Sequence, residues 1–145
     1  MGFICKQYQC FVRLANAASP AMLLIIRFWI ANIFWASGMV KINDWEGTIY
    51  LFTYEHPVPF LMPELAAYMG TAVELICPVL LALGFATRLA TIPLIIMTAV
   101  INFTYQESPE HYYWAMLLGV LLCYGAGKFS VDYLLCRKGC PSHKK

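Results

Sequence analysis

Four long apolar runs, separated by short polar connections, constrain the fold of this chain more than any other feature. They cover residues 21–42, 64–85, 89–105 and 112–135, and Gly84 and Arg88 mark a tight turn between the second and the third. About 20 apolar residues in a helix cross the hydrocarbon core of a bilayer, which is roughly 30 Å thick. Because hydrocarbon offers the backbone no hydrogen bonds, spanning segments satisfy their own as helices. We therefore predict an all-α fold, an integral membrane four-helix bundle.

Composition supports lipid as the medium around these helices. Of the 145 residues, 61% are hydrophobic and 12% are charged, against about 25% charged in a soluble domain. A chain of this size cannot bury so much apolar surface in its own core. A net charge of +2 without a basic run argues against a nucleic-acid partner. The expected partners are the lipid bilayer and either another membrane protein or a second copy of the chain.

Basic residues predict how the helices are oriented. Lys6 and Arg13 precede the first run, Arg88 lies between the second and third, and four basic residues follow position 135. The two remaining connections, 43–63 and 106–111, carry mainly acidic residues. Loops rich in Lys and Arg face the cytoplasm. We therefore predict a multi-pass protein with cytoplasmic N- and C-termini.

Both ends of the chain are predicted to be short cytoplasmic segments. Residues 1–20 have an amphipathic pattern, which indicates either a helix on the membrane surface or a frayed tail. Residues 136–145 form a basic tail. The four terminal cysteines are Cys5, Cys10, Cys136 and Cys140. The cytoplasm keeps such thiols reduced, and the final C-x3-C-x2-H pattern lacks the usual zinc spacing. The sequence therefore predicts no metal site and assigns these cysteines no role.

Ionisable residues within or beside the apolar runs are the strongest pointers to a site, because a charge in lipid is costly and turns toward a partner. The predicted buried charge network consists of Arg27, Glu74, Arg88 and Asp132. Two pairings of Arg27 stay open, one with Glu74 at a Cα level roughly 8 Å away and one with Asp132. A purely structural role, in which such pairs set the helix register, is an equally open interpretation.

Residues nearer the outer edge are candidates for binding a ligand. They are Lys41, Glu74, His111 and Trp114. Lys41 is also interpreted as extending its ammonium to the outer interface. His111 and Trp114 are three residues apart and share a helical face, which suits a quinone head group or a substrate entrance. An aromatic belt at the interface explains the aromatic residues equally well. No catalytic residue is identified.

The same residues match the pattern of a known family. The matching pieces are Arg27, 37–41, 56–60, 66–68, 74–84, 86–88, His111 with Trp114, and 125–132. This ordered set resembles the DoxX family of small bacterial membrane proteins over about residues 21–135. Ala126 stands where the family usually has proline, and Val131 where it has leucine.

The resemblance implies a DoxX-like domain of four transmembrane helices in the bacterial inner (plasma) membrane. Some DoxX-like proteins look like subunits of quinone-linked oxidoreductases. The expected function is therefore an accessory or quinone-interacting subunit of a membrane redox complex, with no intrinsic cofactor and quinone as the expected ligand. The alternative is a non-catalytic assembly factor, chaperone or partner subunit, and small-solute transport ranks last. Whether the chain is an enzyme stays open.

Overall fold

The computed structural model describes residues 2–55, 57–58, 61–104 and 108–139, and all regular structure within these ranges is helical. The elements are α1 (Gly2–Asn43), α2 (Trp45–Tyr50), the π-helical turn η1 (Leu51–Glu55), α3 (Pro63–Leu83), α4 (Thr87–Thr104), α5 (Pro109–Tyr124) and α6 (Val131–Gly139). The predicted all-α class is confirmed over these residues. Two of the helices, α1 and α3, are long and apolar enough to cross a membrane. Four spans and their orientation stay a prediction.

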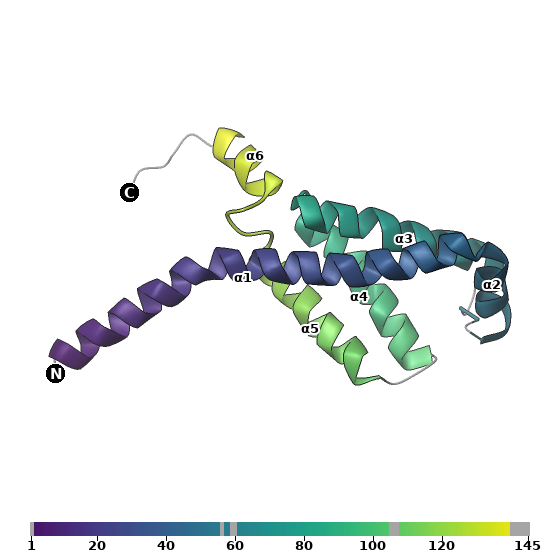
Figure 1. Cartoon of the computed structure of the whole chain (residues 1–145), viewed down its shortest axis with the longest axis horizontal. Helices are drawn as coiled ribbons and strands as arrows, with labels where there is room; N and C mark the ends of the chain where they lie inside the picture. The colour runs from purple at the N-terminus through teal and green to yellow at the C-terminus, as the bar shows by residue number, and fades with distance from the viewer. Residues whose placement is uncertain (1, 56, 59–60, 105–107, 140–145) are drawn as a thin grey trace.

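Helix α1 is continuous from the predicted N-terminal segment into the first apolar run. It has 42 residues and contains Pro20. Residues 2–20 are therefore helical rather than frayed, and Figure 1 shows this part of α1 projecting away from the other helices. Its predicted position on a membrane surface stays a prediction.

The turn between α3 and α4 lies where the sequence predicts it. Helix α3 ends in Gly84, which has φ 67°. Gly84 donates its N–H to the Leu81 carbonyl, and Phe85 donates to the Leu80 carbonyl, both at 3.0 Å. These bonds satisfy the last carbonyls of α3, as a left-handed glycine cap does. Helices α3 and α4 thus occupy the runs predicted at 64–85 and 89–105, with shifts of one or two residues.

The fourth predicted span, 112–135, is not one helix. Helix α5 ends at Tyr124, and α6 begins only at Val131. Gly125 and Gly127 in the intervening turn have φ 74° and 75°, a conformation that glycine adopts freely and that ends a helix. The prediction was wrong here because it extended the apolar run through Gly125, Gly127 and Lys128, where the backbone turns.

Helices α1, α3, α4 and α5 pack in a ring around one core, with α1 against α3, α3 against α4, α4 against α5, and α5 against α1. The core side chains include Ile30, Phe34, Leu81, Leu94, Leu118 and Leu121. Helices α1 and α3 are antiparallel, because Gly38 lies beside Leu75 while Arg27 lies beside Gly84. Figure 1 shows these two helices side by side along the long axis of the molecule.

Large apolar side chains lie on the outer surface of the packed helices as well as in their core. Trp29, Leu89, Ile96, Phe103 and Met116 are all more than half exposed. Monomeric soluble proteins rarely expose contiguous apolar surface on this scale.

Candidate functional site

A buried ion pair joins α1 to α3. Glu74, on α3, is 2% exposed, and its two carboxylate oxygens lie 2.6 Å and 2.5 Å from Nζ of Lys41 on α1. The hydroxyl of Ser37, one turn before Lys41, accepts a hydrogen bond from Nζ at 3.0 Å and donates one to Glu74 at 3.2 Å. The carboxylate, the ammonium and the hydroxyl therefore form one closed cluster.

This geometry corrects two predictions. Glu74 does not pair with Arg27, because the antiparallel register places Glu74 beside Gly38, about 16 Å further along α1 than position 27 at 1.5 Å per residue. The predicted difference of roughly 8 Å between the Cα levels of Arg27 and Glu74 assumed that α3 lies at a different position along the axis of α1. Lys41 does not extend to the outer interface either, since its ammonium turns inward and its side chain is 17% exposed.

Arg27 bonds to backbone carbonyls instead of to a carboxylate. It is 1% exposed. Its Nη1 donates to the Ala126 carbonyl at 2.6 Å, and its Nη2 donates to those of Phe129 at 3.0 Å and Ala82 at 3.4 Å. Asp132 attracts it electrostatically, but no hydrogen bond or salt bridge joins the two within the described part of the chain. Arg27 thus ties the turn after α5 to α1 and to the end of α3.

The other two members of the predicted charge network also bond to backbone. Asp132, on α6, accepts the N–H groups of Ala86 at 2.8 Å and Thr87 at 3.1 Å, which are among the groups left unpaired at the start of α4. Arg88 is exposed and donates to the Cys123 carbonyl at 3.0 Å. The expectation of a single network is therefore wrong: one end of the molecule holds Arg27, Arg88 and Asp132, and Glu74 lies elsewhere with Lys41.

The four predicted ligand-binding residues, by contrast, line one cavity. Lys41, Glu74, His111 and Trp114 all face a space of about 380 Å³. Most of its remaining wall is apolar and comes from η1, α3 and α4, with Phe52, Met69, Met97 and Ile101 among the lining residues. The sequence analysis missed Ser37, although its position four residues before Lys41 on one helix was a usable signal.

His111 lines this cavity and carries a buried ring nitrogen without a protein partner. Its ring lies edge-on to Trp114, with centroids 5.3 Å apart, and Trp114 lies edge-on to Phe34 at 5.9 Å. The Nδ1 atom of His111 is buried and has no hydrogen-bond partner among the described residues. Buried polar atoms usually have a partner, so the unpaired nitrogen marks His111 as a candidate polar contact. Trp114 packs against the core, which argues against a belt role for it.

Some residues of interest in the sequence lie outside the part of the chain that the structure describes. They are His56, Tyr105, Cys140 and His143, together with the side chain of Cys5. Cys10 and Cys136 are exposed free thiols. Where the structure describes side chains, no group of three or more His, Cys, Asp or Glu residues is placed to hold a metal.

Fold and site together define a small all-helical protein with an apolar exterior and a cavity that ends on a buried ion pair. The family model for DoxX matches residues 22–107, more than half of the chain, and the protein belongs to the DoxX family. The predicted family membership is thereby confirmed. The match ends before His111 and Trp114.

Two curated relatives are similar over most of the chain. An uncharacterized protein of Haemophilus influenzae is 29% identical over 137 residues, which cover 85% of this chain and 89% of the relative. The inner membrane protein YphA of Escherichia coli is 35% identical over 105 residues, which cover 70% of this chain and 66% of the relative. No solved structure matches the chain significantly.

Proposed function

We propose that this chain is a multi-pass protein of the bacterial inner membrane, with α1, α3, α4 and α5 each crossing the bilayer. Membership of the DoxX family and the name of the YphA relative support this placement. The apolar exterior supports it physically, because Trp29, Leu89 and Phe103 would contact lipid instead of water. Helices α4 and α5, with 18 and 16 residues, are near the lower length limit for a span.

The positive-inside rule then orients the cavity. Lys6, Arg13 and Arg88 would lie on the cytoplasmic side. Because α1 and α3 are antiparallel, Lys41 and Glu74 would lie toward the outer side. The cavity would thus be open to the outer half of the bilayer. Retention of the chain in membranes washed with carbonate, together with accessibility of tags fused to each end, tests both parts of this placement.

The cavity supports binding of a quinone head group, in an accessory or quinone-interacting subunit of a membrane redox complex. The observation that carries this proposal is an apolar cavity of about 380 Å³ with a few convergent polar groups, as small-molecule sites usually have. The His111 ring, which lines the cavity, can donate to a quinone carbonyl through a protonated ring nitrogen or accept from a quinol hydroxyl through an unprotonated one. The Glu74 carboxylate, which lines the cavity, can accept from a quinol hydroxyl, while Lys41 already donates to Glu74 and Ser37. Quinone chemistry also needs an electron donor or acceptor, which a partner subunit would supply.

A second candidate is a non-catalytic partner subunit or assembly factor. The part of α1 from residue 6 to residue 19 favours it, because this stretch is almost entirely exposed and projects from the packed helices (Figure 1). Phe11 and Leu14, 67% and 71% exposed, would give a partner an apolar surface.

Quinone content of the purified protein separates these two functions. We expect quinone to copurify with the wild-type chain and to fall about 3- to 10-fold in His111→Ala, the loss that one hydrogen bond accounts for. Gly70→Leu should also lower the quinone content. A Cβ added at Gly70 would lie 3.3 Å from the Phe52 ring, so the larger leucine side chain would fill part of the cavity. Ile96→Ala, on the exposed face of α4, is the matched control.

Two results would contradict the quinone proposal. One is wild-type protein carrying no more quinone than the surrounding lipid does. The other is quinone content unchanged in both cavity variants. A membrane subunit that copurifies equally with the wild type and with those variants would favour the second candidate.

A further inference from the structure

A single polar residue lies in the middle of the exposed apolar face of α1. Along this face the exposed positions Ile25, Phe28, Asn32, Trp35 and Met39 follow one another at alternating intervals of three and four residues. This is the spacing of the contact seam between two helices in a coiled coil. Asn32 is central in the seam and lies halfway between Ala21 and Asn43, hence near the middle of the proposed span.

Asn32 has no partner of its own in the described part of the chain. Its side chain is exposed, and no hydrogen bond to another described residue reaches it. An amide without a hydrogen-bond partner is strongly unfavourable in hydrocarbon. A lipid tail offers no donor or acceptor, so a polar group from another protein chain at the same depth would stabilise this position.

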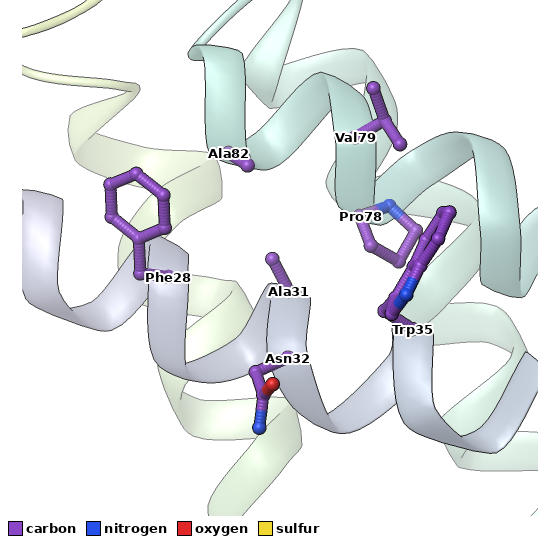
Figure 2. Close-up of a pocket in the computed structure, with 7 residues that line it drawn as sticks. All are labelled: Phe28, Ala31, Asn32, Trp35, Pro78, Val79 and Ala82. Atoms are coloured by element: carbon purple, nitrogen blue, oxygen red, sulfur yellow. The ribbon is translucent and has the colours of Figure 1, made fainter. Parts of the chain in front are cut away.

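A groove beside Asn32 is shaped to take a side chain from such a helix. Its volume is about 270 Å³. Figure 2 shows Phe28 and Trp35 standing on either side of Ala31, with Pro78 and Ala82 of α3 across the groove and Asn32 pointing away from α3. The small side chains of Ala31 and Ala82 leave a hole between the larger ones, and a large side chain of a second helix can fill it, as in knobs-into-holes packing.

We propose that this face is the seam of a symmetric dimer, in which Asn32 of each copy bonds to Asn32 of the other. Copies inserted in the same orientation are related by a two-fold axis along the membrane normal. Their α1 helices are then parallel, and each residue lies at the depth of its own counterpart. An amide donates and accepts at once, so two such groups satisfy each other, and hydrogen bonds of this kind join membrane helices. A second copy therefore fits better than any partner that needs a separate polar match.

The dimer depends on the membrane placement proposed above but not on quinone binding. Carbonate washing tests the placement, and quinone content can be measured on the same samples as the dimer. A monomer that stays in washed membranes would therefore refute the dimer alone.

Cross-linking in native membranes locates the seam. In a chain whose native cysteines are replaced, Ile25→Cys and Met39→Cys should form a covalent dimer on oxidation. Ile76→Cys on α3 and Ile96→Cys on α4 are the controls and should stay monomeric, although these positions are as exposed as Ile25 and more exposed than Met39. Cross-linking that is stronger at the controls, or that joins the seam to a different protein, would overturn the proposal.

The strength of association tests the role of Asn32. In the otherwise wild-type chain, Asn32→Leu should weaken dimerisation in lipid vesicles about 3- to 30-fold, measured by single-molecule photobleaching across protein densities. Leucine suits an exposed face in lipid, so this variant keeps its fold, and Ile96→Leu should dimerise like the wild type. Unchanged dimerisation of Asn32→Leu, or a wild-type chain that is monomeric at every density, would refute the proposal.

Discussion

Separating Lys41 from Glu74 should destabilise the protein far more than removing both residues together. In Lys41→Met, the carboxylate of Glu74, 2% exposed, keeps only the hydrogen bond from Ser37. Removing one partner of a buried ion pair costs about 3–5 kcal/mol, because the other charge is left unpaired. We expect a loss of this size in the free energy of unfolding.

The two single substitutions should not be equivalent. In Glu74→Leu the remaining ammonium is already 17% exposed and can turn along α1 toward the outer interface, as lysine does in membrane helices. Its cost should be close to that of lost hydrogen bonds to a charged group, about 1.5–3 kcal/mol. The double variant Lys41→Met/Glu74→Leu leaves no buried charge, and replacing a buried pair by apolar residues is about neutral.

Reversible unfolding in mixed micelles, followed by the fluorescence of the four tryptophans, measures all three variants in a double-mutant cycle. The double variant should be clearly more stable than Lys41→Met alone. A double variant whose loss equals the sum of the two single losses to within about 0.5 kcal/mol would mean that the residues act independently and would refute this reasoning.

Three further changes test the end of the molecule around Arg27. Arg27→Leu removes donors from three backbone carbonyls and should cost about 3 kcal/mol or more, with faster proteolysis at the turn after α5 as the readout. Gly84→Ala should lower the thermal stability strongly, because φ is 67° and the new Cβ would lie 2.6 Å from Cβ of Ser130. Gly119→Ala, whose new Cβ would meet nothing within 4 Å, is the control and should be neutral in the same thermal assay. Asp132→Ala removes the carboxylate that caps the start of α4 and should cost about 0.5–2 kcal/mol of stability. Amide hydrogens in the first turn of α4 should then exchange faster, and unchanged exchange would contradict the capping role.

Local signals explain the predictions that the structure confirmed. The length of the apolar runs favoured helices, because a regular helix satisfies its own backbone in an apolar medium. The turn at Gly84 was visible because glycine at the end of an apolar run commonly takes the left-handed cap. The same rule applied to Gly125 and Gly127 would have split the fourth run, but the strongly apolar stretch before them outweighed that signal.

The candidate site was predictable as a set of residue types and not as a set of contacts. Lys41, Glu74, His111 and Trp114 were selected because charges and amphipathic rings inside apolar helices turn toward polar surroundings. That they line one cavity follows from the packing of α1, α3 and α5 together with η1. The role of Ser37 also became visible only with the closed cluster that it completes.

By itself, the sequence determined that the chain is helical, which residues carry charge in an apolar setting, and to which family the chain belongs. Only the tertiary structure decided the partners: Glu74 with Lys41, Arg27 with three carbonyls, and Asp132 with the start of α4. The reason is axial register. Hydropathy is nearly unchanged when one helix slides along another by two turns, whereas the partner of each charge changes completely. The contacts that set this register, Gly38 on Leu75 and Gly84 on Arg27, join residues far apart in the chain.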